Sequence, residues 1–68
     1  MNEFEQGCIT KWVGDRGFGF IRCDGSPDCF LHHSAVDPAD LPLQVGQRVE
    51  FRRIAAPKGE QAADVHLI

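Results

Sequence analysis

Two short stretches decide the fold of this chain: RGFGFI at positions 16–21 and CFLHH at positions 29–33. Each alternates small or aliphatic side chains with aromatic ones, which is the two-residue period of a β-strand. Between them, DGSPD at positions 24–28 has the composition of a hairpin loop. The two stretches are therefore predicted to be neighbouring antiparallel strands over residues 17–23 and 29–33.

Alternation gives this strand pair two different faces. One face is predicted to carry Phe18, Phe20, Phe30 and His32. The opposite face carries Gly19 and Cys29, and it joins residues of later strands in a predicted core of Ile21, Leu31, Val49, Phe51, Val65 and Leu67. Three phenylalanines and a histidine on the other face are too aromatic for ordinary protein surface.

Glycine and proline recur so often along the chain that no interval is long enough for an ordinary helix. Three further strands are predicted, over residues 7–13, 47–54 and 62–68, together with one helical turn within 34–40. Five short strands in 68 residues predict an all-β fold, a small antiparallel barrel or sandwich.

Length and charge limit the possible functions. A chain of 68 residues forms a single domain, residues 1–68, with residues 1–6 expected to be a flexible lead. Seven Lys and Arg against ten Asp and Glu give a net charge of -3, so the chain does not bind nucleic acid by charge alone. The sequence has no apolar signal or membrane segment, and we expect a cytoplasmic monomer with reduced thiols and no membrane contact.

The aromatic face has the chemistry of a nucleobase-stacking surface. Arg16 and Arg22 flank the phenylalanines, and Gly17 and Gly19 are interpreted as leaving the rings open to a ligand. An open ring stacks on a base, and a nearby cation meets the phosphate. No Gly-Lys-Ser/Thr phosphate loop is present, so no ATP and no other cofactor is expected.

These residues resemble the cold-shock domain family. Residues 16–21 resemble its first RNP motif, residues 29–36 its second, residues 46–51 its fourth strand, and residues 58–65 its closing loop and strand. The resemblance covers the chain from about Gly7 to Ile68. It implies an OB-type Greek-key barrel of five antiparallel strands that binds single-stranded RNA or DNA as a non-catalytic RNA chaperone.

The resemblance also assigns candidate binding residues, which are Lys11, Trp12, Arg16, Phe18, Phe20, Phe30, His32, His33 and Lys58. The family usually reads Lys-Trp-Phe-Asn before its first motif, whereas positions 11–14 read KWVG. Counting back from Arg16 without a gap puts Lys11 at the family's Trp; a shorter loop would put Trp12 there. Either register favours Trp12 on the binding face, with a bulge or strand end near Lys11.

Two other departures reduce the number of expected stacking platforms. His33 stands where the family commonly has Phe, and the loop over 38–43 offers only Leu41 where an aromatic is usual. We therefore expect weaker binding than that of a member with the full aromatic set.

Other interpretations of the sequence are less well supported. The RNA-recognition motif shares the pattern of residues 16–20, but it needs two helices and the opposite order of its RNP elements. A protein-interaction barrel, or the N-terminal module of a longer protein that docks a partner on its aromatic face, is the main alternative function.

The pair Cys29 and His32 has zinc-like spacing but lies on opposite faces, and a Cys23–Cys29 disulfide would need unusual strand geometry. Nothing marks an enzyme, and Arg52 and Arg53 fit either phosphate contacts or solvated surface.

Overall fold

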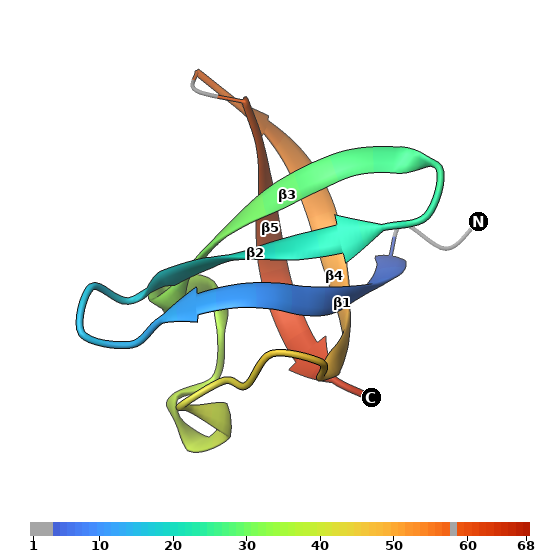
Figure 1. The fold of residues 1–68 in the computed structure, drawn as a ribbon. Coiled ribbons are helices and arrows are strands. Elements are labelled where there is room, and N and C mark those ends of the chain that lie inside the picture. Colours follow the sequence, from blue (N-terminus) through green and yellow to red (C-terminus); the bar gives the residue numbers. More distant parts are fainter. Residues whose placement is uncertain (1–3, 58) are drawn as a thin grey trace.

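The computed structural model describes residues 4–57 and 59–68. Its five strands are β1 (Phe4–Val13), β2 (Phe18–Cys23), β3 (Ser26–His32), β4 (Arg48–Ala56) and β5 (Gly59–Leu67). They close into a barrel in the order β1-β2-β3-β5-β4, with β4 and β5 crossing behind the first three strands in Figure 1. The predicted OB-type barrel is confirmed, and the described part of the chain contains no α-helix.

One detail of the predicted topology is wrong, because the barrel is not wholly antiparallel. Four neighbouring pairs are antiparallel, but β3 and β5 run parallel and pair through Phe30 and Gln61. A closed ring with an odd number of strands cannot alternate direction all the way round. The β3–β5 seam is where the parallel pair falls.

Several element boundaries differ from the prediction. Residues 4–6, expected in a flexible lead, are part of β1 because they pair with β4 up to Phe4–Arg52. β3 begins at Ser26, so only Asp24 and Gly25 remain as the hairpin turn. The predicted helical turn is instead two short 3₁₀ turns, η1 (His33–Ala35) and η2 (Pro38–Asp40).

Five of the six predicted core residues, Ile21, Leu31, Val49, Phe51 and Val65, have no more than 1% of their surface exposed. The sixth, Leu67, is 37% exposed because it ends β5 at the rim of the barrel. Ala62 is buried and its neighbour Ala63 is half-buried, since the β4–β5 register shifts between Glu50 and Arg52, opposite Asp64. Asp64 has φ = 51°, and this bulge resets the alternation of β5.

Candidate nucleic-acid interface

Three phenylalanine rings form a cluster on the outside of β2 and β3. The ring centroids of Phe18 and Phe30 lie 5.9 Å apart with planes at 22°, and Phe20 meets Phe30 edge-on at 5.8 Å. Phe18 pairs with His32 across the strands, and Phe20 pairs with Phe30. All four side chains are half-buried, while Ile21 and Leu31 between them point into the core. We call Phe18, Phe20, Phe30 and His32 the aromatic face.

Two adjacent histidines extend this row of rings beyond the end of β3. The ring centroids of His32 and His33 lie 4.4 Å apart at an angle of 36°. The backbone N–H of Ser34 donates to Nδ1 of His32 at 3.3 Å, and Ser34 Oγ lies 2.8 Å from the same atom. Because a backbone N–H can only donate, neutral His32 carries its proton on Nε2.

A bulge in β1 separates Lys11 from Trp12. The β1–β2 register shifts between Ile9 and Lys11, which leaves Thr10 as the extra residue. Beyond the bulge, Lys11 pairs with Phe20 and Trp12 pairs with Gly19. The bulge predicted near Lys11 is therefore present, at Thr10. The expectation that Trp12 shares the face of the phenylalanines is wrong, since Trp12 packs against the core on the opposite side of the sheet.

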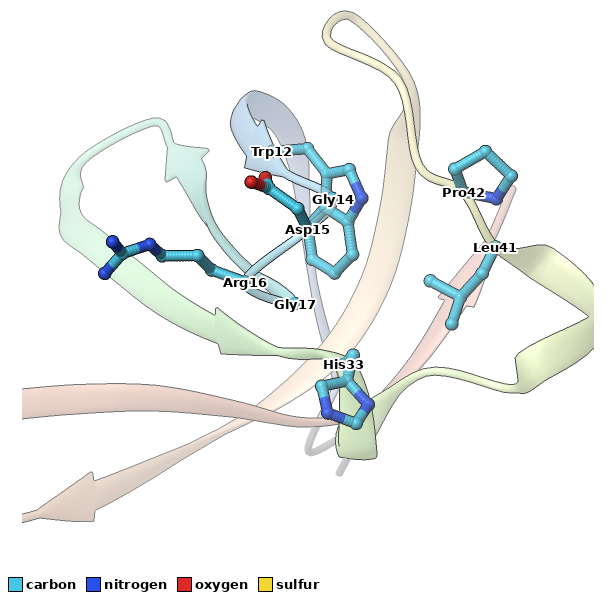
Figure 2. Close-up of a pocket in the computed structure, with 8 residues that line it drawn as sticks. All are labelled: Trp12, Gly14, Asp15, Arg16, Gly17, His33, Leu41 and Pro42. Atoms are coloured by element: carbon cyan, nitrogen blue, oxygen red, sulfur yellow. The ribbon is translucent and has the colours of Figure 1, made fainter.

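Trp12 instead forms one wall of a pocket at the β1–β2 turn. Figure 2 shows its indole ring, the imidazole of His33 and the side chain of Leu41 around a common space, which has a volume of about 450 Å³. Within the described residues, Nε1 of Trp12 is buried without a hydrogen-bond partner. We call this the turn pocket, and its lining is Trp12, Gly14, Asp15, Arg16, Gly17, His33, Leu41 and Pro42.

The two glycines of the first motif have a different role from the one that the sequence suggested. A Cβ on Gly19 would overlap the backbone oxygen of Lys11 and lie 2.9 Å from Cε3 of Trp12, and one on Gly17 would overlap the ring of His33. Gly17 also has φ = +71°, where a side chain is strained. Both glycines therefore make room for the walls of the turn pocket, and they do not border the phenylalanine rings as open surface.

A groove of about 480 Å³ lies at the other end of the aromatic face. Phe20 and Phe30 form one wall, and the facing ends of β4 and β5 form the other, with Ala56, Pro57, Gly59, Glu60 and Gln61. We call it the hairpin groove. These β4–β5 residues were not predicted as site residues, although Gly59, Glu60 and Gln61 lie in a segment that resembles the family's closing loop and strand. The predicted site residue Lys58 lies outside the described residues.

The comparison with protein families agrees with this geometry. Residues 5–68 match the family model described as the "'Cold-shock' DNA-binding domain". The chain belongs to the cold-shock domain family. It is thus a nucleic-acid-binding domain of the cold-shock type, and the match runs through all five strands.

Curated relatives of this cold-shock domain are similar in length. The cold shock-like protein CspA of Stigmatella aurantiaca is 49% identical over 62 residues, which cover 87% of this chain and 91% of the relative. The cold shock protein CspA of Staphylococcus saprophyticus is 39% identical over 62 residues, with 90% and 94% covered. The protein of the same name from Staphylococcus aureus matches equally well.

The cations of the cold-shock domain fall into two groups. Lys11, Arg16, Arg22 and Arg48 are exposed, and Figure 2 shows the guanidinium of Arg16 directed away from the turn pocket. Arg52 and Arg53, which the sequence left undecided, both form ion pairs within the domain, with Asp64 and with Glu5 and Glu60. The first group is the one open to a phosphate.

The three cysteines, all within the described residues, are free. Cys29 is fully buried on the core side of β3, opposite His32, so the pair with zinc-like spacing does not converge. No group of three or more metal-ligating side chains occurs among the residues described. Burial raises the pKa of the Cys29 thiol from 9.0 to about 11 and also raises that of Cys23.

The part of the cold-shock domain described here has no helix long and apolar enough to span a bilayer.

Proposed function

We propose that this domain binds single-stranded RNA or DNA by stacking bases on the aromatic face. The observation that carries the proposal is the cluster of three half-exposed phenylalanine rings on neighbouring strands, with centroids 5.8 to 6.5 Å apart. Stacking on an aromatic side chain contributes about 1–3 kcal/mol per base and tolerates any base. Several platforms together outweigh the net charge of -3.

The path of the strand follows the row of rings. The hairpin groove adjoins Phe20 and Phe30, the pair Phe18 and His32 comes next, and His33 leads into the turn pocket. Bases lie on the rings, the Nε2–H of His32 donates to a base or phosphate, and Lys11 and Arg16 meet the backbone. Lys11 pairs with Phe20 across β1 and β2, so the contact at this position is ionic and not stacked.

A domain that captures unpaired bases favours unfolded RNA. In the proposed role as an RNA chaperone, the domain binds bases exposed when a hairpin opens and delays their re-pairing. Binding free energy is the only driving force required, and neither a cofactor nor a catalytic step takes part. We further propose that it acts as a cytoplasmic monomer.

The direct test is the affinity for labelled oligo-dT and oligo-U against a duplex of the same length, measured by anisotropy at two salt concentrations. We expect binding to the single strands and little binding to the duplex. Equal affinity for the duplex would contradict stacking. The alternative in which the aromatic face docks a protein predicts no binding to either nucleic acid.

A further inference from the structure

Arg53 joins four strands through one side chain. Its Nε and Nη2 donate to the two carboxylate oxygens of Glu5 in β1 at 2.9 and 3.3 Å. Its Nη1 donates to the backbone oxygen of Pro27 in β3 at 3.0 Å and lies 3.4 Å from Glu60 Oε2 in β5. The side chain is only 14% exposed, and its hydrogen bonds to Glu5 raise its pKa. Most of its donors are therefore already satisfied within the domain.

These contacts cross the strand junction with the fewest register pairs in the described part of the barrel. The parallel β3–β5 seam has one register pair in the described strands, between Phe30 and Gln61, whereas the β4–β5 pair has seven. Arg53 contacts β3 through Pro27 and β5 through Glu60, on either side of this seam. It thus adds a polar connection where the backbone ladder is short.

The same seam forms the hairpin groove. Phe30 lines one wall, and Glu60 and Gln61 line the other. Arg53 is not among the lining residues, so it acts on the groove through Glu60. It also pairs a carboxylate that would otherwise stand unpaired beside the path of a polyanion.

The neighbouring residue Arg52 provides a contrast. It makes a single ion pair, from Nε to Asp64 Oδ2 at 2.8 Å, and the two side chains are 42% and 55% exposed. Exposed pairs of this kind contribute little to stability. Arg52 and Arg53 are adjacent in sequence, but only Arg53 reaches the groove wall.

We propose that Arg53 is a positioning residue for nucleic-acid binding, which holds Glu60 and the β5 wall of the hairpin groove at the spacing from Phe30 that admits a base. The role presupposes the single-strand binding proposed above. In this positioning role Arg53 does not contact a phosphate, which is the alternative role of an arginine at this position.

The deciding variant is Arg53→Lys, with Arg52→Lys as its matched control. Lysine keeps the positive charge but loses the planar fork that binds Glu5 through two donors while reaching Pro27 and Glu60. We expect Arg53→Lys to weaken oligo-dT binding about fivefold or more, the low end of one stacked base. The salt slope should not change, and Arg52→Lys should leave affinity and slope as in the wild type. Measurements well below the melting temperature of each variant keep the fold intact.

Two results for Arg53→Lys would overturn the proposal. A phosphate contact would be retained by lysine, so wild-type affinity at unchanged stability would refute positioning. A lower melting temperature with wild-type affinity would make the role of Arg53 purely structural.

A second variant guards against failure of Arg53→Lys to fold. Glu5→Gln removes a negative charge outside the groove and weakens the two hydrogen bonds that this side chain accepts from Arg53. Simple electrostatics predicts tighter binding of a polyanion, whereas positioning predicts weaker binding. Tighter binding would therefore refute the proposal.

Amide hydrogen exchange separates this inference from the proposed function, since it needs no nucleic acid. We expect faster exchange at Phe30 and Gln61 in Arg53→Lys, but unchanged exchange at Trp12. If the wild type binds no single strand, the proposed function fails, while the exchange data still decide whether Arg53 holds the seam. Unchanged exchange at both positions would show that it does not.

Discussion

The two faces of the β2–β3 hairpin are formed by alternate residues of the same two strands, yet one face is buried and the other is half-exposed. On the inner face Ile21, Cys29 and Leu31 are completely buried. On the outer face Phe18, Phe20 and Phe30 pack on one another and stay half-exposed. Burial of an aliphatic side chain stabilises the fold, whereas an exposed ring keeps its stacking energy for a ligand. In the proposed function, a shift of a single residue along the strand separates residues that stabilise the fold from residues that bind a base.

Truncation of an inner residue is expected to have the largest effect on stability. Leu31→Ala leaves a cavity in a small core, and we expect it to lower the free energy of unfolding by about 2–5 kcal/mol. Small domains have little stability to lose, so much of the variant should be unfolded at 25 °C. Urea unfolding followed by circular dichroism measures the change. A loss below about 1 kcal/mol would mean that Leu31 is not a core residue.

Truncation of an outer residue should show the reverse pattern. Phe30→Ala should weaken oligo-dT binding by about 1–3 kcal/mol, while unfolding loses at most the ring-pair contribution of about 1.5 kcal/mol. Ile54→Ala is the control, because Ile54 is 43% exposed and lines neither the pocket nor the groove. Titration and thermal melting of both variants give the two numbers. A large stability loss with unchanged affinity would assign Phe30 to the core.

The pH dependence of stability reports on the inner face through the thiol of Cys29. Burial raises the pKa of Cys29 from 9.0 to about 11, so the unfolded chain releases this proton at lower pH than the folded one. The contribution of this thiol to stability is fully present below pH 9 and is lost as the pH rises toward 11. We expect the contribution of Cys29 to fall by about 1 kcal/mol between pH 8 and 10.

Cys29→Val isolates this effect, because it removes the titrating group and keeps an apolar side chain. Its unfolding free energy, measured by urea at each pH, should fall less between pH 8 and 10 than that of the wild type. Identical profiles for the two proteins would show that Cys29 does not titrate in this way.

The fluorescence of Trp12 distinguishes the turn pocket from the aromatic face. A bound strand should change the emission of Trp12 through the pocket, since Trp12 does not share the face of the phenylalanines. Phe20→Ala should then weaken binding but keep the spectral change at saturation, whereas His33→Ala should reduce that change. The opposite pattern would place the indole among the stacking rings.

The smallest expected effect is that of a single cation. Arg16→Ala should reduce the log–log salt slope of binding by about 0.7 and weaken all sequences alike. Arg48→Ala is the control, an exposed cation at the start of β4 outside both binding hollows. Affinities from low to moderate salt measure both slopes. A total slope steeper than about -5 would mean that charge, and not stacking, dominates.

The sequence by itself determined the faces of β2 and β3, because the two-residue period is a local property of an extended chain. Phe18, Phe20, Phe30 and His32 were predicted on one face, and the structure places them together. Most of the core followed from the same rule. Gly17 and Gly19 were predicted to leave the phenylalanine rings open, whereas the structure places them against His33 and Trp12.

Only the tertiary structure decided what depends on long-range pairing. The bulges at Thr10 and Asp64 each insert a residue against another strand, and they moved Trp12 into the turn pocket and Ala62 into the core. The parallel seam arises from closing five strands into a ring, and the difference between Arg52 and Arg53 depends on which carboxylates that ring brings near. Alternation counts residues along one strand, whereas a bulge or a cross-barrel ion pair is fixed by the strand beside it.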